Sequence, residues 1–340
     1  MPVTPQDMYE SMVVSNRGSY CFGQNGLLLG MLRGLGYRAY AAAGRVLVPP
    51  PPPAPPSAPP VYSAPHHLVL LVQPHNPSSP LGNVTYMVDV GFGGTGPVRP
   101  ILLADGSASN QQRTADDGEL DEECVTNGGW VWGTYPPERH RLVCGALPGS
   151  SLETRLGSGR APARDWHLQV SHASVRPSSA SAPSASAKPE WTTLYSFTEA
   201  EFFQADIDAA SFAVSYMSGS IFLTSVICTR RFHVALQCAE DEEEVRLRED
   251  EGGHDATTQA RSVSGDSLAG GAPGPFVGKW NLEGGRATKR IGRGVVQERT
   301  FTTESERLAI LKDVFGVGVR PEDEQWIVGW PAALQPNTLT

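Results

Sequence analysis

This 340-residue chain contains many short apolar runs, and the segments between them are too polar or too rich in proline to form a core. This pattern is the feature that most restricts the possible folds. Few helical patterns lie between these runs. Successive strands with few intervening helices favour an antiparallel sheet or barrel over a parallel sheet. The expected strands are Arg45–Val48, His67–Val72, Tyr86–Val90, Trp130–Trp132, Arg141–Val143, Trp166–Val170, Phe222–Cys228, Arg231–Leu236 and Val295–Phe301.

Long segments of biased composition interrupt these strands. Pro49–Pro60 is almost entirely proline and predicts an extended polyproline II excursion, with a PxxP-binding partner as the less favoured alternative. Ser174–Pro189 is rich in Ser, Ala and Pro, and the acidic run Glu240–Glu251 leads into a Gly/Ser-rich stretch that ends at Pro275. These segments lack the apolar content that would offset the entropy of ordering, so we expect surface loops.

Helical patterns lie near the two ends of the chain and between the strands. Pro5–Val14 is a plausible helix, and another is expected at Thr198–Ala210. Thr303 and Glu306 form a capping box before a one-sided apolar pattern, which predicts a helix there. A further helix is expected to begin near Phe22, because apolar residues then recur at helical spacing. These residues are Leu27, Leu28, Met31, Leu32 and Leu35.

Composition restricts the class of protein. Hydrophobic residues make up 40% of the chain, which allows a sizeable core, and the net charge of −9 disfavours nucleic acid and anionic membranes as partners. No apolar run reaches membrane-spanning length, and no signal peptide is visible, so we expect a cytoplasmic protein. An odd count of five cysteines without CxxC spacing argues against a zinc site or disulfide framework.

Cys21 stands where a loop should turn into a helix, within the stretch Arg17–Asn25. The positive end of a helix dipole favours thiolate over thiol, and the thiolate is the nucleophilic form. A lone cysteine is more often a buried structural residue. The other four are expected to be inert thiols: Cys124, Cys144, Cys228 and Cys238.

A histidine and a carboxylate are available to activate this thiol. His66 and His67 open one apolar strand, and Asp89 lies inside the next, beyond the turn-rich connection Gln73–Val84. A buried carboxylate is costly unless it is paired, and adjacent antiparallel strands could place His and Asp side by side. The alternative is an edge histidine and a turn-proximal aspartate without a catalytic role.

Three blocks, taken in order, resemble the arylamine N-acetyltransferase family: Arg17–Asn25, the His67–Val72 strand, and Val88–Gly93 with the sequence Val-Asp-Val-Gly-Phe-Gly. The resemblance implies that Cys21 is the nucleophile, that Asp89 is the orienting acid, and that His67 is the base. The resemblance selects His67 rather than His66 as the base, because the family's histidine stands five residues before the final valine of the strand, here Val72. Weaker similarity continues in Trp191–Thr198, Ser218–Thr224 and Thr303–Arg307.

The chain also departs from the family pattern. Ser19 replaces a glycine and Gly23 replaces a glutamate. The cysteine lies several dozen residues earlier than the family places it, which predicts a chain truncated in its first helical domain and therefore marginally stable. The Pro/Ser/Ala insertions resemble those of filamentous-fungal proteins.

The resemblance implies an α+β fold with a cysteine-protease-like Cys–His–Asp plan. We expect a remnant helical segment over residues 1–36, an antiparallel β-barrel-like domain over 37–197, and a linking helix with an α/β lid over 198–340. The glycine-rich loop after Asp89 offers backbone amides that suit a phosphate or pantetheine chain. The expected cofactor-binding residues are Phe92, Gly93, Gly94 and Thr224, with Phe92 and Phe222 as walls of an apolar amine pocket.

A basic cluster lies between candidate strands. Because charge runs are commonly solvated, a solvated hairpin is the favoured interpretation, with coenzyme A binding as the alternative. The cluster consists of Arg286, Lys289, Arg290 and Arg293.

The predicted function is transfer of an acetyl, malonyl or propionyl group from acyl-CoA to an arylamine or arylhydrazine, through a Cys21 thioester. No permanently bound cofactor and no metal are expected; acetyl-CoA or malonyl-CoA is the donor substrate. Two alternatives stay open: an inactive truncated homologue and, less favoured, a cysteine hydrolase. The residues do not indicate the acyl group, the acceptor or the oligomeric state.

Overall fold

The computed structural model describes residues 3–48, 60–104, 129–134, 138–148, 150, 165–172, 190–236, 247–248, 276–291 and 294–334. Most of the predicted insertions lie outside these ranges, as do Cys124, Cys238 and Arg293. The acidic run expected to be a loop contains one described element, the short strand β10 (Leu247–Arg248).

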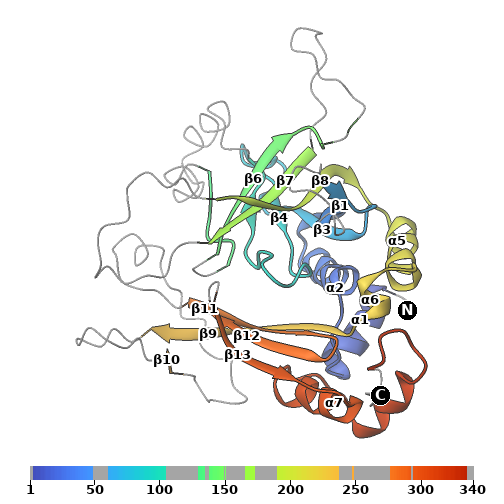
Figure 1. Cartoon of the computed structure of the whole chain (residues 1–340). Coiled ribbons are helices and arrows are strands. Elements are labelled where there is room, and N and C mark those ends of the chain that lie inside the picture. Colours follow the sequence, from blue (N-terminus) through green and yellow to red (C-terminus); the bar gives the residue numbers. More distant parts are fainter. Residues whose placement is uncertain are drawn as a thin grey trace, which may run out of the picture.

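An eight-stranded antiparallel sheet forms the centre of the molecule, as the strand pattern predicted (Figure 1). Its strands pair in the order β5-β4-β3-β1-β8-β7-β6, and β2 pairs with the end of β1. The strands are β1 (Arg38–Val48), β2 (Val61–Tyr62), β3 (His67–Gln73), β4 (Tyr86–Val88), β5 (Ile101–Leu102), β6 (Glu138–Gly145), β7 (Asp165–His172) and β8 (Thr192–Glu201).

The two ends of this sheet are brought together by one short segment, which makes it a nearly closed barrel. Val131 forms an isolated antiparallel bridge to His140 on β6. Two residues further on, the carbonyl of Gly133 accepts hydrogen bonds from the backbone N–H groups of Val98 (2.7 Å) and Arg99 (2.9 Å), just before β5. The expected strand Trp130–Trp132 is therefore only a bridge, but it closes the barrel.

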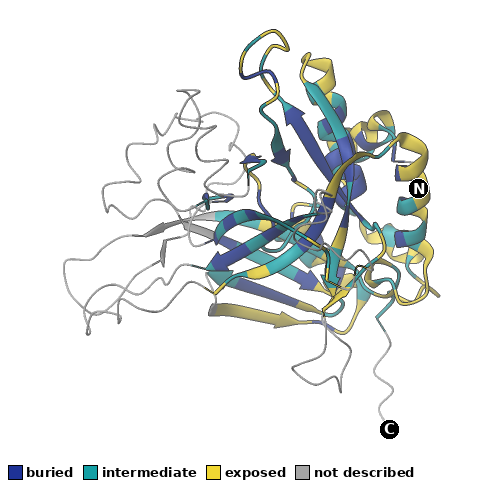
Figure 2. Cartoon of the chain, turned by 90° about the horizontal axis from the view of Figure 1, so that it is seen from above, coloured by how far each residue is buried: buried dark blue, intermediate teal, exposed yellow. Residues whose placement is uncertain are grey.

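Strand β3 is buried along nearly its whole length because both of its faces are covered. Alternate side chains on a strand point to opposite faces. Leu68, Leu70 and Val72 pack in a cluster that includes α2, whereas Val69 and Leu71 point into the barrel core. Figure 2 shows buried residues concentrated on the barrel strands and exposed residues on the outer faces of the helices.

The N-terminal helices cover one side of the barrel. The expected helix at Pro5–Val14 is present as α1 (Pro5–Tyr9) continued by one π-helical turn (Glu10–Val14), and α2 spans Cys21–Gly34. Leu29 on α2 is buried, but Met31 and Leu35 are 57% and 74% exposed. The C-terminal half of the helix that carries the cysteine therefore presents an apolar face to solvent.

A second antiparallel sheet of five strands lies below the barrel in Figure 1, with the order β10-β9-β11-β12-β13. Its longer strands are β9 (Ile227–Leu236), β11 (Phe276–Glu283), β12 (Arg286–Ile291) and β13 (Gly294–Thr300). Helix α7 (Glu304–Asp313) and a 3-10 helix (Pro321–Trp326) follow. The predicted capping box is confirmed, because the backbone N–H of Glu306 donates to Thr303 Oγ1 and that of Thr303 donates to the Glu306 carboxylate.

Two expected elements between the sheets are placed differently. The linking helix α5 spans Gln204–Tyr216 rather than beginning at Thr198, because β8 continues to Glu201 and pairs there with Ala42 of β1. The expected strand at Phe222–Cys228 begins instead as the short helix α6 (Ile221–Thr224), whose first turn is capped by Ser220.

Candidate active site

Cys21 is the first residue of α2 and is almost completely buried, with 5% of its surface exposed. Tyr20 before it has an extended backbone, so the chain turns into the helix at the cysteine itself. The thiol points toward the start of strand β3, and Sγ lies 3.8 Å from the carbonyl oxygen of His66. Gly91 packs directly on this turn, because a Cβ there would lie only 2.5 Å from Cys21 Cα.

His67 and Asp89 form a buried pair, with Nε2 of the imidazole 2.8 Å from Oδ2 of the carboxylate. The register of β3 and β4 explains the pairing. Leu70 lies opposite Val88, so continuing the ladder places Asp89 beside Val69, with His67 two residues along on the same face. His66 is half-buried, and its pKa is lowered by burial and by the charge of Arg45.

Asp89 accepts five hydrogen bonds and is only 1% exposed. Three come from side chains and two from the backbone N–H groups that follow it. The donors to Oδ2 are His67 and Tyr195 (both 2.8 Å), and those to Oδ1 are Asn25 Nδ2 (2.9 Å), Gly91 N (2.8 Å) and Phe92 N (3.2 Å). A carboxylate satisfied in this way is stable as an anion inside the core.

The electrostatics of the pair favour a charged imidazolium beside a charged carboxylate. Burial alone lowers the pKa of His67, but the charge and hydrogen bond of Asp89, with a contribution from Cys21, raise it to about 10. Burial opposes ionisation of Asp89, yet His67, Asn25 and Gly91 together lower its pKa. The imidazole can therefore accept a proton and retain it.

Two residues of this site were not singled out from the sequence. Asn25 lies one helical turn after Cys21, and its amide also donates to the carbonyl of Leu68 (2.6 Å) while accepting from Val90 N. Tyr195 comes from β8 and is fully buried. The i, i+4 spacing from the cysteine was the available signal for Asn25.

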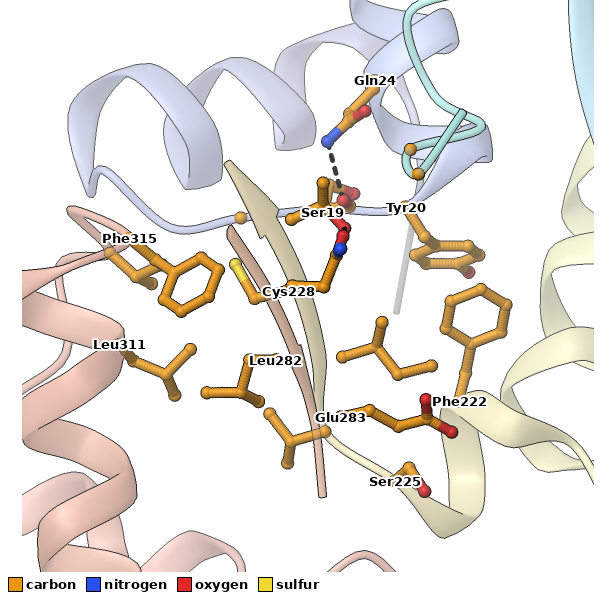
Figure 3. A pocket seen from close by; sticks show the side chains of 18 of the residues that line it. Ser19, Tyr20, Gln24, Phe222, Ser225, Cys228, Leu282, Glu283, Leu311 and Phe315 are labelled. Atoms are coloured by element: carbon orange, nitrogen blue, oxygen red, sulfur yellow. Dashed lines mark hydrogen bonds between the residues drawn. The ribbon is translucent and has the colours of Figure 1, made fainter. Parts of the chain in front are cut away.

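A cavity of about 1650 Å³ opens beside the cysteine turn, between the barrel, α2 and the C-terminal sheet. Figure 3 shows Ser19, Tyr20 and Gln24 on one side, Phe222 and Ser225 on another, and Leu282, Leu311 and Phe315 on the C-terminal side. Phe92 and Phe222 both line it, as expected for walls of an apolar pocket.

The expected cofactor-binding residues fall in different places. Gly93 and Gly94 line the cavity and have positive φ values of 68° and 47°. Thr224 does not line it: its hydroxyl donates to the carbonyl of Ser220 within α6. Two of the loop amides expected to face a ligand, those of Gly91 and Phe92, donate to Asp89 instead.

The basic cluster lies on strand β12, which forms hairpins with β11 and β13 as expected, but its side chains are not all solvated. Arg286 and Arg290 line the cavity, and Arg286 is also paired with Glu298 at 2.6 Å. Lys289 is 8% exposed and lies over the rings of Phe232 and Trp280. Alternate side chains on a strand point to opposite faces, so Arg286 and Arg290 face the cavity whereas Lys289 packs against aromatic rings of the sheet.

The other described cysteines are Cys144 and Cys228, and both are half-buried. Burial raises the pKa of Cys228 to about 11, which disfavours the reactive thiolate. Within the described ranges, no group of three or more His, Cys, Asp and Glu side chains is arranged to hold a metal. No helix in the described part of the chain is long and apolar enough to cross a membrane.

Comparison with known proteins gives an independent view of this arrangement. A family model described as N-acetyltransferase matches residues 1–132. N-malonyltransferase FDB2 of Gibberella moniliformis is 24% identical over 322 residues, 94% of this chain and 70% of that protein. An arylamine N-acetyltransferase of Mycobacterium tuberculosis is 36% identical over 108 residues, which are 31% of this chain and 33% of that one.

Solved structures show the same fold. An arylamine N-acetyltransferase from Salmonella typhimurium superposes with a TM-score of 0.55 at 18% identity, covering 96% of this chain and 81% of that one. The M. tuberculosis structure gives 0.53 at 22% identity, over 96% and 80%. These structures show the fold, and the family match with the curated relatives points to an enzyme of the acyltransferase class. Within that class the chain resembles the arylamine N-acetyltransferases, which confirms the resemblance indicated by the three motifs.

The two departures from the family motif lie against each other in space. A Cβ on Gly23 would clash with the Ser19 side chain and would also lie 2.5 Å from Met8 Sδ. The larger residue at position 19 thus requires the absence of a side chain at position 23. Together the two substitutions leave the helix start intact.

Proposed function

We propose that this protein transfers an acyl group from acyl-CoA to an arylamine or arylhydrazine through a thioester on Cys21. One observation carries the proposal: a buried histidine–aspartate pair lies beside a cysteine at a helix N-terminus, next to a large cavity. The family match and the relatives' names support the acyl-transfer chemistry.

In the first half-reaction, His67 takes the thiol proton of Cys21, and Asp89 stabilises the imidazolium. The thiolate attacks the acyl carbonyl of the donor. The N–H groups in the first turn of a helix have no intrahelical acceptor, so those of α2 are suited to stabilise the oxyanion. Collapse of the intermediate breaks the bond to coenzyme A, whose thiolate leaves with the proton from His67.

In the second half-reaction, the neutral amine attacks the thioester carbonyl, and His67 accepts the proton that nitrogen loses. The Cys21 thiolate leaves and an N-acyl product forms. An aromatic amine is uncharged near neutral pH, so apolar walls such as Phe92 and Phe222 suit it better than a counter-charge.

The proposal covers more than one acyl group on the donor. Relatives are named for acetyl and for malonyl transfer, so we include both, together with propionyl. The cytoplasmic location and the division into residues 1–36, 37–197 and 198–340 also stay predictions.

Intact-mass spectrometry after mixing the protein with acetyl-CoA or malonyl-CoA tests the proposal. We expect a single acyl adduct that an arylamine removes, and no adduct on Cys21→Ser, because a serine hydroxyl is a far weaker acid than a thiol. Cys228→Ser is the matched control and should still form the adduct. Absence of any adduct would favour the inactive homologue, and an adduct lost to water without an amine would favour a hydrolase.

A further inference from the structure

Arg231 on β9 lines the cavity and is half-buried. Its Nη2 atom donates to two backbone carbonyls, those of Gly94 (3.0 Å) and Gly96 (2.6 Å). Its Nε atom is buried and has no hydrogen-bond partner among the described residues. The guanidinium is thus held in place by neutral acceptors.

The positive charge of Arg231 has no carboxylate in contact with it among the described residues. Glu138, whose charge acts on Arg231, is already engaged by Lys279 Nζ at 2.8 Å and by His172 Nε2 at 3.5 Å. Burial lowers the pKa of Arg231, whereas the charges of Glu138 and Asp89 raise it. Of these groups only Arg231 lines the cavity, so it presents a positive charge there, in a chain of net charge −9.

One loop connects this charge to the nucleophile. Gly91 packs on Cys21, and the carbonyls of Gly94 and Gly96 bind Arg231. Thr229, two residues before Arg231 on β9, lies 3.9 Å from where a Cβ on Gly93 would be. The loop is thus fixed to the cysteine turn at one end and to β9 at the other.

Holding the loop does not by itself require a permanent charge. A neutral side chain can donate to two carbonyls without the cost of desolvating a cation. An unpaired, partly desolvated guanidinium at a substrate cavity is suited to a carboxylate, which it binds through charge-assisted hydrogen bonds.

We propose that Arg231 binds the free carboxylate of an acyl group attached to Cys21, so that the preferred donor is a dicarboxylic acyl thioester of the malonyl type. The inference rests on the proposed acyl transfer through Cys21. In a malonyl thioester, one methylene separates the reacting carbonyl from the free carboxylate. Arg231 is then a specificity-determining residue.

The first experiment needs no variant. The protein is mixed with equal concentrations of malonyl-CoA and acetyl-CoA at limiting time, and intact mass gives the ratio of the two adducts. A charge-assisted contact worth about 1.5–3 kcal/mol corresponds to a preference of roughly 10- to 100-fold for malonyl. Equal adducts, or an acetyl preference, would overturn the inference while leaving acyl transfer intact. No adduct from either donor would instead remove the proposed function, and this inference with it.

The second experiment compares kcat/KM for malonyl-CoA, acetyl-CoA and p-nitrophenyl acetate in the wild type and in Arg231→Gln, Arg231→Lys and Arg230→Gln. Arg230 is the matched control, because it is adjacent on β9 but donates to the carbonyl of Val314 (2.8 Å). Arg231→Gln should lose roughly 10- to 100-fold with malonyl-CoA and only about threefold with the other donors. Arg231→Lys should recover part of the malonyl activity, and Arg230→Gln should leave the donor preference unchanged.

Two outcomes would contradict the specificity role. An equal loss with both CoA donors, but none with p-nitrophenyl acetate, would show that Arg231 contacts the coenzyme A moiety. An equal loss with all three donors would show that Arg231 only positions the loop. Should Arg231→Gln fail to fold, the ratio of malonyl to acetyl activity in Arg231→Lys decides instead, since a changed ratio supports the role and an unchanged ratio refutes it.

Discussion

The hydroxyl of Tyr195 provides a direct test of how Asp89 is stabilised. It donates to Asp89 Oδ2 at 2.8 Å from a side chain that is fully buried. The ring packs against His67 and Phe92, with centroid distances of 4.6 and 5.1 Å. Burial and the charge of Asp89 raise the pKa of Tyr195 well above its ordinary value, so the hydroxyl remains a donor throughout the working pH range. Tyr195→Phe deletes this donor and leaves the ring in place.

The loss should be that of one hydrogen bond to a buried charge, about 1.5–3 kcal/mol of unfolding free energy. It should not reach the cost of an unpaired carboxylate, because four other donors to Asp89 remain. With an unfolding entropy of roughly 2.1 cal/mol/K per residue, a chain of 340 residues should melt about 2–4 °C lower.

Differential scanning calorimetry of Tyr195→Phe, with acylation followed by intact mass, measures both effects. The control is Tyr40→Phe, whose hydroxyl donates to the carbonyl of Glu199 (3.1 Å) at a more exposed position and should cost less than about 1 kcal/mol. We expect Tyr195→Phe to retain acylation, because His67 still contacts Asp89 Oδ2 and the aromatic ring that packs on His67 is kept. A melting temperature unchanged from wild type, or a loss no larger than that of Tyr40→Phe, would refute the assignment of this hydroxyl to the charged carboxylate.

Three further outcomes are expected. Gly91→Ala should cost about 1–3 kcal/mol and slow acylation, since its Cβ would lie 2.5 Å from Cys21 Cα; normal melting and rates would contradict the close packing. His67→Ala should lower the acylation rate by about 10²–10⁴-fold while His66→Ala has little effect, and the reverse order in stopped-flow assays would make His66 the base. Burial opposes ionisation of Glu138, but its partners lower its pKa from an ordinary 4.5 to about 2. The ionised carboxylate therefore adds to the free energy of unfolding above pH 4.5, and this stabilisation is lost as the pH falls toward 2. Glu138→Gln should therefore flatten the pH dependence of denaturant midpoints in that window, and an unchanged slope would show that Glu138 does not contribute.

Much of the site was predictable because its signals are local. An apolar pattern at helical spacing places a helix start at Cys21, and one unbroken apolar run predicts β3 with His67 at its entry. Asp89 was expected inside the strand Tyr86–Val90, beyond a turn-rich connection, and it lies directly after β4, which ends at Val88. These signals depend on neighbours within a few residues, and the antiparallel pairing of consecutive strands follows from them.

Local signals were insufficient where one segment could adopt two structures. The apolar run beginning at Phe222 suits a strand, but the Ser220 cap and the positive φ of Gly219 (84°) start the helix α6. Strand β12 carries three charged residues in six, and β11 mixes apolar residues with Gly, Lys, Asn and Glu, so neither shows a clear apolar pattern. They pair with each other across the turn at Gly284, and β11 also pairs with β9.

The sequence alone determined the helix start at the cysteine, the two buried strands and the acyltransferase motifs, because propensity and periodicity act over short spans of chain. Only the tertiary structure decided that Tyr195, 106 residues away, completes the hydrogen bonds of Asp89, and that the amides of Gly91 and Phe92 serve the carboxylate. The same holds for Arg231, whose place at the cavity depends on how the C-terminal sheet meets the loop after Asp89. Such contacts follow from sheet register and from the packing of one sheet on the other, which no short stretch of residues contains.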